Sequence, residues 1–170
     1  MAVILITGAS SGIGFQTAKD LAQQGHVVYG AARRLNKLEA LAPYGVKPLS
    51  LDITNEQSLS QAVATLIASE GRIDVLINNA GYGSYGAVED VSIDEARQQF
   101  EVNLFGMARL TQLVLPYMRA QREGRIINTS SMGGRLVSYM GAWYHATKYA
   151  VEAFSDALPG SDTQRRAHET

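Results

Sequence analysis

Hydrophobic and polar positions alternate along this chain between two periods. Short runs rich in β-branched residues, such as Val3–Thr7, are apolar at nearly every position, which is typical of strands covered by helices on both faces. Longer stretches between them repeat their apolar residues at helical spacing. The pattern predicts strands at Val3–Thr7, His26–Ala32, Val46–Leu51, Ile73–Asn78 and Gly124–Thr129, and helices at Gly12–Gln24, Asn36–Leu41, Ser58–Glu70, Ser92–Arg122 and Gly141–Leu158.

Strands and helices follow one another in turn, so right-handed crossovers should bring the strands together in a parallel sheet. We therefore expect an α/β fold of the Rossmann-like, doubly wound kind, with three α/β/α layers and five recognisable strands. Pro116 predicts a kink or a bend near the end of the long stretch 92–122. Residues 1–158 are expected to form one dinucleotide-binding domain and the polar residues 159–170 a disordered tail.

Composition excludes several classes of protein. Hydrophobic residues make up 46% of the 170 residues, enough to build a core, and 15 Lys and Arg against 16 Asp and Glu leave a net charge of −1. This balance offers no basic surface for nucleic acid or an anionic membrane. Without cysteine there is no disulfide framework or thiolate site, and no cluster of His, Asp and Glu suggests a metal. The apolar run Ala2–Ile6 is too short for a bilayer span or a signal peptide, so we expect a soluble cytoplasmic protein.

A glycine-rich turn directly follows the first predicted strand and opens the first helix. In Thr7-Gly-Ala-Ser-Ser-Gly-Ile-Gly14, Gly8 would permit the tight turn, Gly12 would let the backbone approach a phosphate, and Gly14 would let helix and strand pack closely. The helix N-terminus would then present free N–H groups to a pyrophosphate. A triphosphate loop is disfavoured, because no Gly-Lys-Ser/Thr follows. The turn predicts a dinucleotide site formed by Gly8, Ser10, Ser11, Gly12, Ile13 and Gly14.

Three further motifs recur at independent positions. Asn-Asn-Ala-Gly ends at Gly81 after the fourth predicted strand, Ser130-Ser131 follows the fifth, and Tyr144-His-Ala-Thr-Lys148 begins thirteen residues beyond Ser131. Together with the Gly-x-x-x-Gly-x-Gly spacing and Asn103 in the long helix, these motifs resemble the short-chain dehydrogenase/reductase family from Met1 to about Leu158. The resemblance implies an oxidoreductase that interconverts a carbonyl and an alcohol by hydride transfer.

Tyr144 and Lys148 stand one helical turn apart, so their side chains share a face. Free tyrosine has a pKa of about 10, and a neighbouring cation favours its phenolate. The resemblance implies that Tyr144 is the acid or base, that Ser131 holds the substrate oxygen, and that Asn103 helps hold a water in a proton relay. It also places Asn79, Ala80, Gly81, Tyr144 and Lys148 against the cofactor.

Three aromatic residues near this motif have no assigned role. His145 is expected to face solvent rather than take part in the chemistry. Trp143 and Tyr139 could line the mouth of a substrate site, but packing in the core or on the surface explains them equally well.

The end of the second predicted strand indicates which nicotinamide cofactor is used. An acidic residue there would bind the ribose hydroxyls of NAD, but this chain has Ala32 followed by Arg33 and Arg34. A guanidinium matches a phosphate bidentately, so we expect NADP(H), with NAD less favoured. Asp52, with Ile53 beside it, resembles the family's adenine-contacting acid.

The resemblance stops where the family continues with a sixth strand, a substrate-covering segment and a seventh strand, so the C-terminal strands are expected to be missing. Two functions remain open. One is an NADP(H)-dependent enzyme acting on a small carbonyl or alcohol, and residues 81–90 resemble the retinol- and hydroxysteroid-type branch. The other is a dinucleotide-binding or interaction module with impaired turnover. We expect a homo-dimer or homo-tetramer formed through the two long helices, and an exposed apolar edge at the fifth strand.

Overall fold

The computed structural model describes the backbone of residues 1–168 and the side chains of residues 1–158. Within it the chain divides into two compact units. The sheet unit comprises Met1–Gly81 and Phe105–Thr129, and the helical unit comprises Tyr82–Leu104 and the residues from Ser130 onward. A single domain over residues 1–158 therefore stays a prediction.

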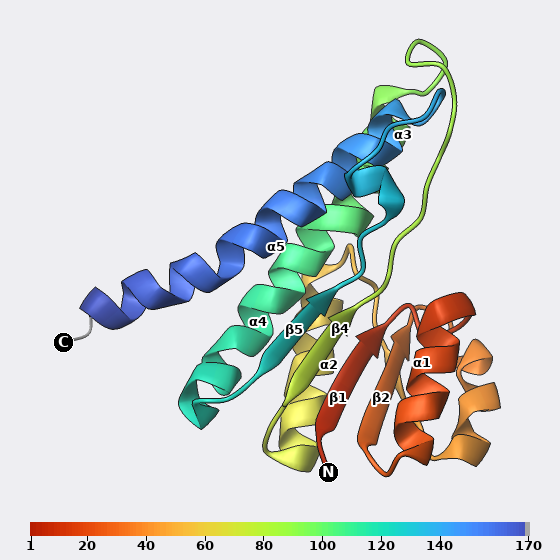
Figure 1. The fold of residues 1–170 in the computed structure, drawn as a ribbon. Coiled ribbons are helices and arrows are strands. Elements are labelled where there is room, and N and C mark those ends of the chain that lie inside the picture. The colour runs from red at the N-terminus through yellow and green to blue at the C-terminus, as the bar shows by residue number, and fades with distance from the viewer. Residues whose placement is uncertain (169–170) are drawn as a thin grey trace. The chain divides into compact units, whose positions relative to one another are not determined.

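A five-stranded parallel sheet forms the centre of the sheet unit (Figure 1). The strand order is β3-β2-β1-β4-β5, so successive strands are added on one side of β1 as far as β3 and on its other side from β4 onward, as in a doubly wound fold. The chain contains β1 (Val3–Thr7), β2 (Val27–Ala32), β3 (Lys47–Ser50), β4 (Val75–Asn78) and β5 (Arg125–Asn128). All five residues of β1 are buried, whereas β5 lies at the edge with Ile127 exposed. The predicted sheet and its apolar edge strand are confirmed.

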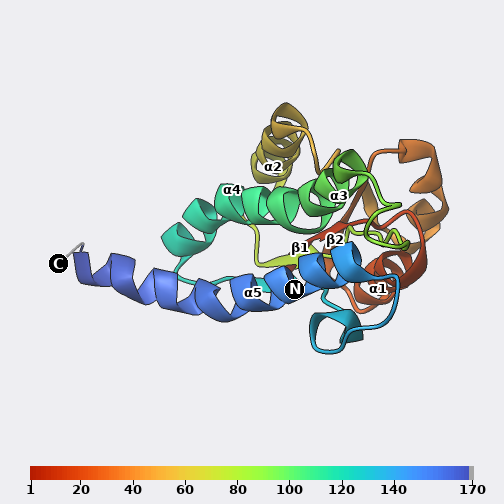
Figure 2. The ribbon, with the colours of Figure 1, turned by 90° about the horizontal axis from the view of Figure 1, so that it is seen from above.

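Helices cover both faces of this sheet. Figure 2 shows α1 (Gly12–Gln23) on one face, and α2 (Glu56–Glu70) and α4 (Gly106–Gln121) on the other. Apolar side chains of α1 and of the strands, such as Ala18 and Ile6, are fully buried in one cluster. Burial of this apolar surface on both faces is what holds the three layers together.

The predicted helix at Asn36–Leu41 is wrong. Two 3₁₀ helices replace it, η1 (Leu35–Lys37) and η2 (Glu39–Tyr44). Pro43 lies inside η2 and has no N–H to donate, and Gly45 ends the segment at a φ of +82°. The stretch is therefore too short and too interrupted to propagate an α-helix.

The predicted helix at Ser92–Arg122 is divided, but at a different place from the one expected. It consists of α3 (Ile93–Phe100), a π-helical turn at Glu101–Phe105, and α4, which continues through Pro116 to Gln121. The break therefore falls at Asn103 rather than at the proline. Wide turns of this kind are frequent at functional sites.

The helical unit contains α3, the short 3₁₀ helix η4 (Met132–Gly134) and α5 (Ala142–His168). Both α3 and η4 contact α5. The helix predicted to end at Leu158 runs on to His168, so most of the tail predicted to be disordered has helical backbone. The side chains of residues 159–170, and residues 169–170 altogether, lie outside the described part. Among the described residues, no helix is long and apolar enough to cross a membrane.

Candidate active site

The predicted cofactor residues of the sheet unit lie along one edge of its sheet. Because all five strands are parallel, their carboxyl ends meet at the same edge, where α/β folds bind ligands. Thr7 pairs with Ala31, and Ala32 pairs with Ser50, so the segments that follow β1, β2 and β3 emerge beside one another. The Ala9 N–H also donates to the Ala31 carbonyl at 3.2 Å, which ties the glycine-rich turn to β2.

The three glycines of the turn differ in their surroundings. Gly8 and Gly12 have φ of +69° and +59°, a conformation that favours glycine. A Cβ added at Gly14 would stand 2.6 Å from the Gly8 carbonyl oxygen, so helix and turn pack too closely for a side chain. A Cβ at Gly12 would meet nothing within 4 Å. Gly12 therefore presents bare backbone to open space, as an approaching phosphate requires.

The N-terminus of α1 is free to receive an anion. Ser11 is the N-cap residue, but its side chain makes no capping hydrogen bond, and Ser10 is half-buried in the turn before it. Ile13 in the first turn of the helix is 72% exposed. N–H groups without a side-chain cap, at the positive end of the helix dipole, form a suitable place for a pyrophosphate.

The segment after β4 is hydrogen-bonded to Thr7, the residue with which the turn begins. The Asn79 N–H and the Ala80 N–H both donate to Thr7 Oγ1, at 3.1 and 3.0 Å, and Asn79 Nδ2 donates to the Thr7 carbonyl at 3.1 Å. A Cβ on Gly8 would also meet Ala80 Cα at 2.9 Å. Asn79 and Ala80 therefore hold the turn in shape, and exposed Gly81 ends this unit. Sequence reasoning missed Thr7, the buried residue to which they bind.

The residues predicted to select the cofactor follow β2 and β3. Arg33 and Arg34 are exposed directly after buried Ala32. Asp52 Oδ1 accepts hydrogen bonds from the backbone N–H and the hydroxyl of Thr54, at 3.0 and 2.9 Å. Ile53 is buried beside it. Two guanidinium groups thus follow the carboxyl end of β2, the position where an acidic residue would select NAD.

In the helical unit, Tyr144 and Lys148 lie one turn apart on α5. The Lys148 ammonium stands 6.0 Å from the centre of the Tyr144 ring. Lys148 is only 7% exposed, and this burial lowers its pKa because a low-dielectric environment disfavours the charged form. A phenol with a partly desolvated cation beside it is suited to proton transfer.

Asn103 holds the segment that covers Tyr144. Its Oδ1 accepts from the Tyr82 N–H at 3.0 Å, and its Nδ2 donates to the Tyr82 carbonyl at 2.8 Å and to Thr147 Oγ1 at 3.0 Å. The Thr147 hydroxyl in turn donates to the Tyr144 carbonyl at 2.7 Å. The Asn103 amide therefore joins this segment to the turn of α5 that carries Tyr144, and the predicted water relay stays a prediction.

Gln99, one turn before Asn103, acts on the same segment. It is fully buried, and its Oε1 accepts from the Ser84 N–H at 3.1 Å. The next residue along, Tyr85, places its ring 5.5 Å from that of Tyr144. Sequence reasoning missed Gln99, although an amide one turn from Asn103 was a visible signal.

Ser131 stands at the start of η4. Its Oγ accepts a hydrogen bond from the Gly133 N–H at 3.0 Å, which fixes the side chain at the N-cap. Tyr139 is almost fully exposed on the loop that follows, and Trp143 is half-buried on α5. The expectation that His145 faces solvent is wrong, because its side chain is only 7% exposed and both ring nitrogens have partners.

The chain is similar in sequence to known proteins. A family model described as short chain dehydrogenase matches residues 2–165. The chain is 48% identical over 157 residues to 3-ketodihydrosphingosine reductase of Bacteroides thetaiotaomicron, covering 92% of this chain but 56% of that protein.

The chain is also similar to solved structures. A short-chain dehydrogenase from Streptomyces avermitilis matches with a TM-score of 0.89 and 41% identity over 92% of this chain and 59% of its own. An actinorhodin polyketide ketoreductase solved with NADPH matches with a TM-score of 0.88 and 34% sequence identity, over 92% of this chain and 63% of its own. The chain thus spans little more than half the length of its curated relative.

Proposed function

The chain belongs to the short-chain dehydrogenase family, and on this basis we propose that it interconverts a carbonyl and an alcohol with NADP(H), using Tyr144 as acid and base. The observation that carries the proposal is the pair on α5, a phenol with a buried ammonium 6.0 Å from its ring. A bound nicotinamide dinucleotide supplies or accepts the hydride in this chemistry.

Tyr144 donates its phenolic proton to the carbonyl oxygen during reduction and removes the hydroxyl proton during oxidation. The positive charge of Lys148 stabilises the phenolate left after donation. Because burial lowers the pKa of Lys148, its ammonium also returns a proton more readily than an exposed lysine would. Ser131, held at the start of η4, hydrogen-bonds the substrate oxygen.

Asn103 is a positioning residue in this proposal. Its contacts with Tyr82 and Thr147 hold the covering segment and the catalytic turn of α5 in one geometry. The turn of Gly8–Gly14, the edge residues Arg33 and Arg34, and Asp52 with Ile53 bind the dinucleotide, and Arg33 favours the 2′-phosphate of NADP.

The substrate proposed is a ketone, in line with the name of the Bacteroides relative. We also propose that the chain self-associates as a dimer or tetramer, which sedimentation of the purified protein would test.

Two measurements on the full chain test the function. NADPH binding is followed by fluorescence, and NADPH oxidation is assayed with a panel of aldehydes and ketones. Tyr144→Phe should keep NADPH binding and lose turnover by roughly 10²–10⁴-fold. Tyr149→Phe, at a partly exposed position on the same helix, is the matched control and should keep both. NADPH binding with no Tyr144-dependent turnover would instead favour the module that binds dinucleotide without catalysis.

A further inference from the structure

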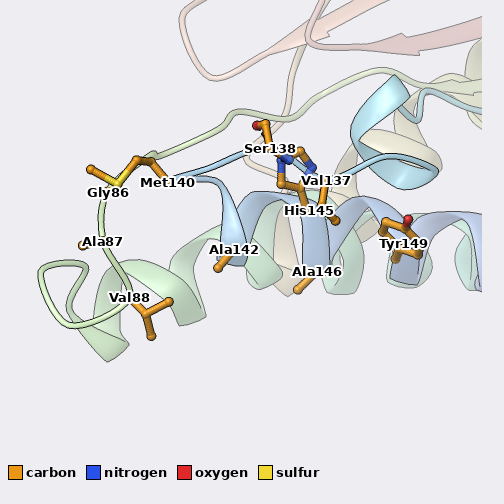
Figure 3. A pocket seen from close by; sticks show the side chains of 10 residues that line it. All are labelled: Gly86, Ala87, Val88, Val137, Ser138, Met140, Ala142, His145, Ala146 and Tyr149. Carbon is orange, nitrogen blue, oxygen red and sulfur yellow. Dashed lines mark hydrogen bonds between the residues drawn. The ribbon is translucent and has the colours of Figure 1, made fainter.

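His145 is a buried imidazole between the catalytic tyrosine and the loop that follows Ser131. Its Nε2 lies 3.0 Å from both the backbone nitrogen and the hydroxyl of Ser138, and its Nδ1 lies 3.0 Å from the Gly133 carbonyl oxygen (Figure 3 shows Ser138 beside the ring). The backbone N–H of His145 donates to the Gly141 carbonyl at 2.8 Å. One side chain therefore joins two points of residues 132–140, which we name the serine loop, to the start of α5.

These partners determine where the ring carries its proton. A backbone N–H can only donate, so Nε2 must accept from Ser138. A carbonyl oxygen can only accept, so Nδ1 must carry the hydrogen that it donates to Gly133. Both bonds form at once only in the neutral ring with the proton on Nδ1. In the other neutral form, and in the imidazolium, Nε2–H would face the Ser138 N–H.

The bond to Gly133 reaches the serine itself. The Gly133 N–H donates to Ser131 Oγ at 3.0 Å, and the Gly134 N–H donates to the Ser131 carbonyl at 2.9 Å. A Cβ on Gly133 would stand 2.7 Å from His145 Nδ1 and 3.2 Å from the Tyr144 ring, so the imidazole, the loop and the phenol are in close packing. The imidazole therefore sets the distance between the residues that hold Ser131 and the turn that carries Tyr144.

We propose that His145, as the neutral ring protonated on Nδ1, is a positioning residue that holds Ser131 in place relative to Tyr144 through the serine loop. This inference rests on the proposed function, because it assigns His145 a task in the same reaction. His145 itself touches no reacting atom. Misplacement of a catalytic group by about 1 Å can cost ~10²-fold in rate, so loss of this link should be measurable.

A cavity of about 470 Å³ makes the link accessible to a small molecule. His145 and Ser138 line it together with apolar residues of α5, of the serine loop and of the segment before α3 (Figure 3). Ala142, Ala146 and Tyr149 form the α5 wall at helical spacing. The space left by His145→Ala would therefore open into this cavity, where free imidazole can enter.

The kinetic test uses variants that keep one bond each. The amide of Asn can donate to Gly133 in place of Nδ1, and the longer amide of Gln can accept from Ser138 in place of Nε2. We expect His145→Phe to lower kcat/KM for a ketone roughly 10–100-fold with NADPH affinity unchanged. The kcat/KM values of His145→Asn and His145→Gln should lie between those of His145→Phe and the parent. Equal losses in Phe, Asn and Gln variants, all folded by circular dichroism, would overturn the proposal.

Chemical rescue tests the link even if His145→Phe fails to fold. Imidazole should restore the activity of His145→Ala, and 1-methylimidazole, which has no N–H to donate, should restore less. Equal effects of the two compounds, or no rescue by either in folded protein, would contradict the assignment.

The NMR test does not need turnover. In ¹⁵N-labelled full chain near neutral pH, the His145 signals should show a protonated Nδ1 and a bare Nε2, with His26→Gln used to remove one other histidine from the spectrum. A proton on Nε2 would overturn the proposal. If Nδ1 is protonated but the parent reduces no ketone, the proposed function fails while the hydrogen-bonded link remains.

Discussion

Gly12→Ala separates the backbone requirement of the glycine-rich turn from its role in binding. Gly12 has a φ of +59°, where an alanine is strained by roughly 1–2 kcal/mol. Its added Cβ would meet nothing within 4 Å, so no packing cost accompanies the strain. We therefore expect the unfolding free energy to fall by only about 1–2 kcal/mol, and Tm to fall by roughly 2–8 °C.

Cofactor affinity should fall by more than this strain explains. If a phosphate approaches the bare backbone at Gly12, the new methyl group stands in its path. Loss of one charge-assisted hydrogen bond, at about 1.5–3 kcal/mol, corresponds to roughly a 10–100-fold weaker Kd for NADPH. The assay is NADPH fluorescence titration together with thermal unfolding in the absence of cofactor.

Gly71→Ala is the matched control. Gly71 ends α2 with a φ of +69°, and a Cβ there also meets nothing within 4 Å. The two variants should therefore lose similar stability, while only Gly12→Ala loses NADPH affinity. If Gly12→Ala binds NADPH as tightly as Gly71→Ala does, the phosphate does not approach this backbone and the assignment of the turn is wrong.

Three other substitutions are predicted to have distinct effects. Lys148→Met should abolish turnover. Because burial lowers the pKa of Lys148, the folded parent should gain stability as the pH rises toward the ordinary pKa of lysine, and thermal melts of the variant should lack this rise. Arg33→Asp should shift preference from NADP to NAD in paired kinetics, and an unchanged ratio would contradict its role. Burial disfavours the charged form of Asp74, but hydrogen bonds from Arg72 and from the Val3 N–H outweigh this effect and lower the pKa of Asp74. The free energy of unfolding should therefore decline as the pH falls below about 5. Urea unfolding of Asp74→Asn should show a smaller decline over the same pH range.

Much of the fold follows from local pattern. Val3–Thr7 is apolar throughout because both faces of its strand are covered, and a covered strand followed by an amphipathic helix predicts a parallel crossover. The break at Asn103 was not predictable in this way. Gly106 directly follows the π turn, but a single glycine within a helical pattern is tolerated and does not by itself predict a break. The turn coincides with hydrogen bonds from Asn103 to Tyr82 and Thr147, which lie far away in the sequence.

Some residues of the candidate site could be predicted from local sequence, and others could not. Gly8, Gly12 and Gly14 could be assigned from sequence because each answers a backbone demand that glycine alone meets at low cost. Thr7 and Gln99 could not, because a threonine or a glutamine has many roles and its hydrogen-bond partners are set by chain segments that only folding brings near.

His145 illustrates the difference most clearly. In the sequence it is a polar residue beside Tyr144, and polar residues on a helix usually face solvent. In the structure, packing of the serine loop against α5 surrounds the ring and supplies an acceptor on one side and a donor on the other. The sequence by itself determined which chemical groups the chain carries and where its five strands lie, but not the 3₁₀ helices η1 and η2 or the π turn at Glu101–Phe105. Tertiary structure alone decided which groups lose water and which partners replace it, because burial and hydrogen bonding depend on contacts between distant segments.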